Sequence, residues 1–298
     1  MNPYIQSLRP RTLPLSISGI ILGTGLAYAA NNELFTTNGS QAWCVFILAV
    51  LTTMSLQILS NLCNELGDAQ KGTDFDQKGR AEYGLQSGKI TELQIKKMIG
   101  YFKGMSVIFG TTLVFTAFQP HALSWDEGWR DVFIFLCLGA LAIVGAIKYT
   151  LGKHSYGYMG LGDLGVFLFF GLLSTMGAYY LQVQNLTAEA AWCGVAIGLP
   201  CVGVLNLNNI RDMQNDIRHG KKTFAGLLGP RGARVYHTLL LIGAVSIFTA
   251  LGHWWVLCIL PVLIYHLWFL WTHDDKLDKQ MPILMFTTLL MAILALFC

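Results

Sequence analysis

Nine stretches of the chain are almost wholly apolar, and polar loops separate them. They cover residues 13–30, 42–62, 104–118, 132–147, 164–181, 190–207, 235–251, 254–271 and 281–298. Most contain 16 to 21 residues, which is close to the length that an α-helix needs to cross a bilayer. Because a backbone inside lipid must satisfy its own hydrogen bonds, helices are the expected elements. The pattern predicts an all-α membrane bundle of about nine transmembrane helices around a central cavity, formed by a single domain (1–298).

The overall composition supports this interpretation. Of the 298 residues, 54% are hydrophobic and only 12% are charged, whereas soluble globular domains carry about 25% charged residues. The seven cysteines are scattered and almost all lie in apolar stretches. Without a C-x-x-C pair, they indicate neither a disulfide framework nor a zinc site.

The basic residues predict the orientation of the bundle. With the nine spans in place, 19 of the 20 Lys and Arg residues fall on the side of the N-terminus and the long loops, and Arg130 falls on the other. The positive-inside rule places that side in the cytoplasm. We therefore expect a multi-pass protein of the cytoplasmic (inner) membrane with its active site facing the cytoplasm. The net charge of +3 follows from this bias and does not indicate nucleic-acid binding.

Two clusters of acids and amides stand at the cytoplasmic ends of apolar stretches. The first, in NLCNELGDAQKGTD, has helical spacing and consists of Asn61, Asn64, Glu65 and Asp68, with Asp74 beyond it. The second, in NLNNIRDMQNDIRHGKKT, consists of Asn208, Asp212 and Asp216. Residues at this spacing share one face of a helix. Because charge near a membrane is costly, such residues usually face a cavity and have a function.

The clusters predict a Mg²⁺ site. Carboxylate and amide oxygens are the ligands that this ion takes, and it completes its shell with water and substrate phosphates. The predicted ligands are Asn64, Glu65, Asp68, Asp74, Asn208, Asp212 and Asp216. Four nearby basic residues are candidates for binding a diphosphate, namely Lys78, Arg80, Arg211 and Lys221. A secondary transporter is the alternative from another class, although transport sites usually lie near the bilayer midplane.

The motifs resemble those of the UbiA superfamily of intramembrane prenyltransferases. Asn64-Glu65-x-x-Asp68 followed by Asp74 is similar to the family's N-D-x-x-D-x-x-x-D, and Asp212-x-x-x-Asp216 to its D-x-x-x-D. Three further stretches resemble the branch that prenylates 1,4-dihydroxy-2-naphthoate in menaquinone synthesis: RPRTLPLSISGIILG (9–23), KYTLGKHSYGYMGLGDLGVFLFFG (148–171) and NNIRDMQNDIRHGKKTFAGLLG (208–229). Two places depart from the family pattern. Glu65 stands where Asp is usual, and LGKHS at 151–155 stands where G-G-P-x-P is usual.

The resemblance implies a Mg²⁺-dependent transferase. Its substrates would be a polyprenyl diphosphate and 1,4-dihydroxy-2-naphthoate, and the products would be demethylmenaquinone, CO₂ and diphosphate. The residues assigned to catalysis on this basis are Asp68, Asp212, Asp216, Lys148 and Tyr149, and those assigned to substrate binding also include Arg9, Arg11 and Asp163. Two of these residues also have an interpretation without a functional role. Lys148 is then a lysine at the membrane interface, and Asp163 is an acid at the N-terminus of a helix. Within the family, 4-hydroxybenzoate or another aromatic acceptor stays open.

Overall fold

The computed structural model describes residues 2–34, 39–73, 84–118, 127–273 and 276–297. Over these residues the protein is helical, and the only β-type pairing is an isolated bridge between Met159 and Lys222. Nine helical runs in the described part are long and apolar enough to cross a membrane. The predicted all-α bundle with nine membrane helices is therefore confirmed.

The runs follow the nine predicted stretches in order. The first five are α2 (Leu13–Ala30), preceded by α1 (Pro3–Leu8) and η1 (Pro10–Thr12), then α4 (Gly39–Lys71), α5 (Glu92–Ala117), α6 (Glu127–Lys148), and α7 (Gly162–Val166) continued by η3 (Phe167–Leu173) and α8 (Ser174–Val183). The others are α9 (Ala188–Arg218), α10 (Phe224–Ala250), η4 (Trp254–Ile259) with α11 (Leu260–Thr272), and η5 (Leu277–Lys279) with α12 (Gln280–Leu294). Because α4 and α9 continue well past their apolar parts, both polar clusters lie on helices.

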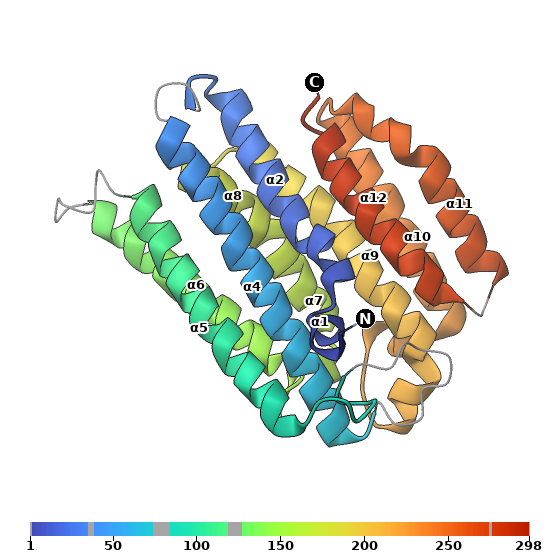
Figure 1. Ribbon diagram of the computed structural model, residues 1–298. Coiled ribbons are helices and arrows are strands. Elements are labelled where there is room, and N and C mark those ends of the chain that lie inside the picture. Colours follow the sequence, from blue (N-terminus) through green and yellow to red (C-terminus); the bar gives the residue numbers. More distant parts are fainter. Residues whose placement is uncertain (1, 35–38, 74–83, 119–126, 274–275, 298) are drawn as a thin grey trace.

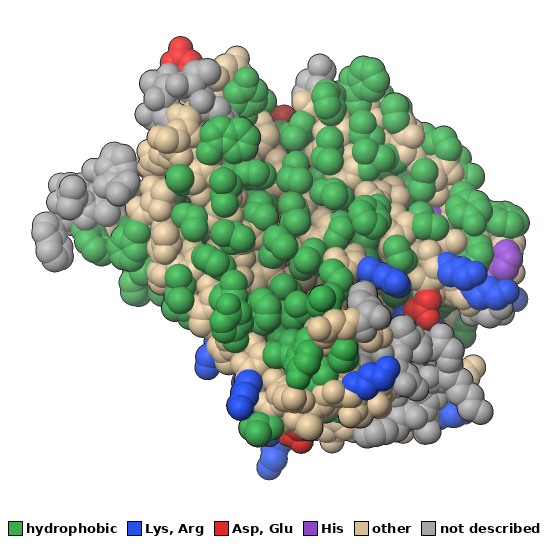
Figure 2. All heavy atoms as spheres, in the orientation of Figure 1, with side chains coloured by type: hydrophobic (Ala, Val, Ile, Leu, Met, Phe, Trp, Pro, Cys, Tyr) green, Lys and Arg blue, Asp and Glu red, His purple; other side chains and the backbone are tan. Residues whose placement is uncertain are grey.

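Helix α9 forms the middle of the bundle. It packs against α2, α8, α10 and α12, while α5 and α6 lie beside α4 at one side and α10, α11 and α12 at the other (Figure 1). The largest buried cluster of apolar side chains joins α2, α9, α10 and α12. In Figure 2, apolar side chains cover most of the visible face, and Lys and Arg gather at the end where α1 lies. Such an apolar belt above a charged end is the surface expected of a membrane protein.

The fifth span contains a π-helical segment, η3, which hydropathy did not predict. It lies against α9 at two glycines, where a Cβ added to Gly171 would be 2.6 Å from the Cα of Gly198. Only glycine permits this approach of two backbones. The wider π turn changes the direction of the side chains that follow it, as π turns in other proteins often do at functional sites.

Candidate active site

The two polar clusters meet in one small pocket at the end of the bundle where α4 and α9 finish. Its volume is about 40 Å³. It is lined by Arg9, Asn64, Asp68, Thr73, Tyr149, Thr150, Leu205, Asn208, Asn209, Asp212, Asp216 and Lys221. The structure therefore brings together residues that lie about 150 positions apart in the sequence. Among them are five of the seven predicted metal ligands.

Several oxygens in this pocket are buried and open to a ligand. The carboxyl groups of Asp68, Asp212 and Asp216 are 8%, 8% and 2% exposed. Asn64 Oδ1 and Asp216 Oδ2 are buried, and none of the described residues donates a hydrogen bond to them. Buried oxygens without a donor are costly unless something binds them, and hard oxygen atoms are what Mg²⁺ takes. The pocket therefore offers oxygen donors of the kind that Mg²⁺ takes, while the described residues include no group of three or more Asp, Glu, His or Cys that could hold a metal ion by themselves.

Arg211 neutralises part of this acidic site. Its Nε donates to Asp212 Oδ1 at 2.6 Å, and its Nη2 donates to Asp212 Oδ2 at 2.5 Å and to Asn208 Oδ1 at 2.7 Å. A further ion pair joins it to Asp278 in η5. The bidentate geometry is the strong form of an Arg–carboxylate pair. In this state Arg211 covers two of the predicted metal ligands, so its predicted role at the diphosphate requires the guanidinium to move.

Tyr158 connects the first acidic cluster to the loop before α7. Its hydroxyl lies 2.7 Å from Asp68 Oδ1 and donates to it, and Thr73 Oγ1 lies 3.0 Å from the same hydroxyl. The ammonium of Lys71 stands 3.5 Å from the centre of the Tyr158 ring. Such a cation–π contact is attractive because the ring face is negative. The structure places Tyr158 as the partner of Asp68, a pairing that the sequence did not predict.

The second cluster is tied to the same place. Asn215 Nδ2 on α9 donates to the backbone carbonyl of Thr73 at 2.6 Å, and the backbone N–H of Lys222 donates to the carbonyl of Tyr158 at 3.2 Å. The ammonium of Lys221 then lies 3.4 Å from Asp216 Oδ1. These bonds fix the spacing of α4 and α9 at the pocket.

Two groups in the loops around the pocket have shifted pKa values. Burial lowers the pKa of Lys221, but the carboxylates of Asp68, Asp216 and Asp212 outweigh it, and the pKa lies above its ordinary value. Burial and then the charge of Asp68 raise the pKa of Tyr158. At neutral pH the lysine is therefore a cation and the tyrosine a hydrogen-bond donor.

Glu65 does not fit its predicted role as a metal ligand. It is fully buried and does not line the polar pocket. Its Oε1 accepts a hydrogen bond from the backbone N–H of Leu85 at 2.7 Å and from Ser7 Oγ at 3.2 Å. Adjacent helical residues point about 100° apart, and here Asn64 faces the pocket while Glu65 faces α1. Glu65 instead joins α4 to α1 and to the segment that begins α5.

Three other predicted residues also lie outside the pocket. Lys148 and Arg11 are exposed and line neither this pocket nor the cavity beside it. Asp163 forms a hydrogen bond with Tyr236 of α10 rather than with Lys148 or the pocket. Lys148 ends α6 at the polar boundary of the bundle, where a long basic side chain can reach water. The predicted residues Asp74, Lys78 and Arg80 lie outside the described part of the chain.

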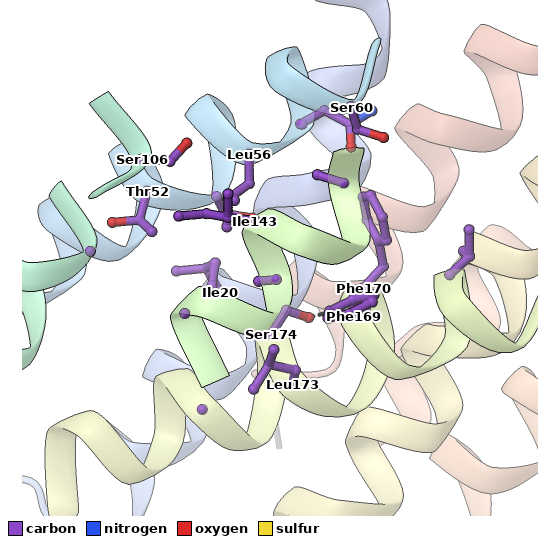
Figure 3. Close-up of a pocket in the computed structure, with 18 of the residues that line it drawn as sticks. Ile20, Thr52, Leu56, Ser60, Ser106, Ile143, Phe169, Phe170, Leu173 and Ser174 are labelled. Carbon is purple, nitrogen blue, oxygen red and sulfur yellow. Dashed lines mark hydrogen bonds between the residues drawn. The ribbon is translucent and has the colours of Figure 1, made fainter. Parts of the chain in front are cut away.

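A much larger apolar cavity adjoins the polar pocket. Its volume is about 500 Å³, and it runs between α2, α4, α5, α6 and the η3–α8 run. The two spaces share the lining residues Arg9, Asn64, Tyr149, Leu205 and Asn208. Figure 3 shows its wall, with Ser60 and Leu56 in the upper part of the view and Phe169 and Leu173 in the lower part. A ligand with a charged head and a long apolar tail matches such a pair of compartments.

Two residues mark the junction of the compartments. Arg9 has a left-handed backbone (φ 52°, ψ 59°) between α1 and η1, a conformation that is uncommon for residues other than glycine and often occurs at functional sites. Tyr149 packs edge-on against Tyr156, with ring centres 5.3 Å apart. Both of these predicted site residues therefore stand where the head and tail of a ligand would meet.

Comparisons with known proteins identify relatives over most of the chain. The profile of the UbiA prenyltransferase family matches residues 25–294. A 1,4-dihydroxy-2-naphthoate octaprenyltransferase of Haemophilus influenzae is 40% identical over 250 residues, which cover 84% of this chain and 77% of the relative. The enzyme of the same name from Escherichia coli is 41% identical over 241 residues, covering 81% and 73%.

Solved structures share the fold at lower identity. An apo UbiA homologue from Aeropyrum pernix superimposes with a TM-score of 0.67 at 17% identity, covering 99% of this chain and 98% of that one. A UbiA homologue from Archaeoglobus fulgidus, bound to DMAPP and Mg²⁺, gives a TM-score of 0.58 at 13% identity and covers 98% and 86%.

Proposed function

Since the chain belongs to the UbiA prenyltransferase family, we propose that it transfers a polyprenyl group from a polyprenyl diphosphate to 1,4-dihydroxy-2-naphthoate. The observation that carries this proposal is the acidic pocket opening directly into an apolar cavity of about 500 Å³. The relatives at 40% and 41% identity support the choice of acceptor. Family membership also separates the chain from the secondary-transporter alternative.

The polar pocket would hold Mg²⁺ together with the diphosphate. The residues that would bind the ion are Asn64, Asp68, Asn208, Asp212 and Asp216, because their oxygens line one pocket. When bound, the ion neutralises the charge of the diphosphate, so that diphosphate leaves more easily. Lys221 and Arg9 border the same pocket and would bind the remaining phosphate oxygens.

The chain's own residues would then control the reacting carbons. The allylic C–O bond breaks with its electron pair staying on the diphosphate, and the ring carbon that bears the carboxylate forms the new C–C bond. Loss of CO₂ returns an electron pair to the ring. Tyr149 and Phe169 line the cavity and present π faces that would stabilise the allylic cation. The apolar wall excludes water, which would otherwise trap that cation.

The proposed location follows from the charge pattern. Lys and Arg gather at the end of the bundle that holds the acidic pocket, so the diphosphate would enter from the cytoplasmic side of the inner membrane. Fluorescent or chemical labelling of cysteines introduced near residues 9 and 187, in intact cells, tests this orientation. Labelling of position 9 from outside the cell would contradict it.

The reaction itself is tested with purified protein. We expect Mg²⁺, a polyprenyl diphosphate and 1,4-dihydroxy-2-naphthoate to give a prenylated product and one CO₂ per turnover, followed by mass spectrometry and CO₂ release. A parallel set with 4-hydroxybenzoate tests the alternative acceptor. Product from 4-hydroxybenzoate and none from the naphthoate would overturn the proposed acceptor.

A further inference from the structure

A short chain of hydrogen bonds crosses from the N-terminal turn to the wall of the apolar cavity. Asn61 Nδ2 donates to the backbone carbonyl of Leu8 at 3.0 Å and to Thr12 Oγ1 at 3.0 Å. Thr12 Oγ1 in turn donates to the carbonyl of Arg9 at 2.9 Å. Gln57 Nε2 donates to Asn61 Oδ1 at 3.3 Å and to Thr12 Oγ1 at 3.1 Å. This series of hydrogen bonds ends at Gln57.

The direction of these hydrogen bonds determines which polar atom of Gln57 has no partner in the series. The carbonyl of Leu8 can only accept, so Asn61 must turn its amide nitrogen towards it. The oxygen of Asn61 then faces Gln57 and must accept from the amide nitrogen of that residue. The remaining atom, Gln57 Oε1, is buried and has no hydrogen-bond partner among the residues that the structure describes. The whole residue is only 8% exposed.

This oxygen belongs to a side chain that lines the cavity, near the acidic pocket. Gln57, Asn61 and Thr12 all line the cavity, as does Ser60 on the same wall (Figure 3). Gln57 precedes Asn64 by seven residues on α4, which is two turns or ~10 Å along the helix. A buried acceptor that lacks a donor costs free energy comparable to a lost hydrogen bond. A ligand in the cavity that carries a donor would therefore bind here.

The substrates of the proposed reaction differ in what they can donate. A prenyl tail has no polar hydrogen, and a diphosphate bound to cations has only acceptor oxygens. The aromatic acceptor has two hydroxyl groups. Its 1-hydroxyl lies beside its own carboxylate and donates to it. Its 4-hydroxyl lies on the other side of the ring and is free to donate to the protein.

Resting on the proposed function, we propose that Gln57 Oε1 accepts a hydrogen bond from the 4-hydroxyl of the aromatic acceptor. The carbon that bears the carboxylate must lie at the allylic carbon beside the acidic pocket, which directs the 4-hydroxyl deeper, towards Gln57. The prenyl tail would then lie along the apolar part of the wall, where Phe169 and Leu173 stand (Figure 3). Gln57 is thus an acceptor-binding residue that sets the orientation of the ring.

The test compares a ligand that has this hydroxyl with one that lacks it. The variant is Gln57→Met, which keeps the length of the side chain and removes its carbonyl. We measure the KM for 1,4-dihydroxy-2-naphthoate and the inhibition constant of 1-hydroxy-2-naphthoate. We expect the KM to rise about fivefold to tenfold, the range of one neutral hydrogen bond. The inhibition constant and the KM of the prenyl diphosphate should change by less than about twofold, since neither ligand uses the bond.

Two further variants make the result specific. Ser106→Ala removes a hydroxyl that also lines the cavity but donates to the carbonyl of Phe102 on its own helix, at 2.8 Å, and should change neither constant. Gln57→Asn keeps the amide and withdraws it by one methylene, and should give the same selective rise even where Gln57→Met folds poorly.

An equal rise in the KM for 1,4-dihydroxy-2-naphthoate and in the inhibition constant of 1-hydroxy-2-naphthoate would show that Gln57 only supports the wall. An unchanged KM for 1,4-dihydroxy-2-naphthoate would show that Gln57 does not touch the acceptor. Either result overturns the inference while leaving the proposed function intact. If the unaltered protein forms no product from the naphthoate, the proposed function fails and the inference fails with it.

Discussion

Two neighbouring acids of the first motif should respond in opposite ways to the same substitution. Asp68 lines the acidic pocket, whereas Glu65 accepts hydrogen bonds from Leu85 and Ser7. We therefore expect Asp68→Asn to remove turnover, with a smaller loss of stability than Glu65→Gln because it weakens one side-chain hydrogen bond, from Tyr158, and not two. We expect Glu65→Gln to lower stability while the folded protein keeps its activity. Each change replaces a carboxylate with an amide of the same shape, so the pair is matched.

The magnitudes follow from the contacts. Hydrogen bonds to a charged group contribute about 1.5–3 kcal/mol, and neutral ones about 1 kcal/mol. Glu65→Gln weakens the two bonds of Oε1 and should therefore cost ~2 kcal/mol, or ~4–8 °C in Tm for a chain of this size. Loss of a carboxylate that stabilises the departing diphosphate removes several kcal/mol, so Asp68→Asn should reduce kcat at least ~100-fold.

Stability and turnover are measured for each variant in the same detergent. Thermal unfolding gives Tm, and product formation against Mg²⁺ concentration gives kcat and the Mg²⁺ requirement. For Glu65→Gln the Mg²⁺ concentration at half-maximal rate should be that of the unaltered protein. A rise of tenfold or more in that concentration, with Tm unchanged, would refute the assignment of Glu65 and restore it as a metal ligand.

Three other predictions concern the ion, the helix contact and the arginines. Removal of Mg²⁺ with EDTA should abolish turnover and leave Tm nearly unchanged, and added Mg²⁺ should restore the rate; a persistent rate would contradict the Mg²⁺ site. Gly198→Leu should destabilise the protein by about 1–3 kcal/mol because a side chain there meets Gly171 and Phe167. Gly104→Leu, where nothing lies within 4 Å, is its control in the same unfolding assay. Arg9→Ala should lower kcat/KM for the prenyl diphosphate about tenfold or more, since a hydrogen bond to a charged group contributes that much; Arg11→Ala should stay within about twofold, and equal effects would contradict the placement of Arg9.

The sequence predicted the spans and the two motif helices because hydropathy and helical spacing are local properties. At Glu65, spacing alone cannot tell which of two adjacent side chains faces the pocket. That choice depends on Ser7 and Leu85, whose positions only the packed structure supplies. The sequence also could not anticipate the pairing of Tyr158 with Asp68, which joins segments 90 residues apart. The π turn of η3 lies where Gly171 meets Gly198 of the neighbouring helix, and hydropathy does not predict it.

The bridge that Arg211 makes to Asp212, Asn208 and Asp278 has a consequence for biogenesis. Many metal-binding domains stay unfolded until their ion arrives, because the ligands repel one another without it. Here an internal cation already balances part of the acidic cluster. The newly made chain can therefore insert into the membrane and assemble α9 against η5 and α12 before any magnesium is present. On the proposed function, the guanidinium would give way to the ion only when substrate binds, separately from folding.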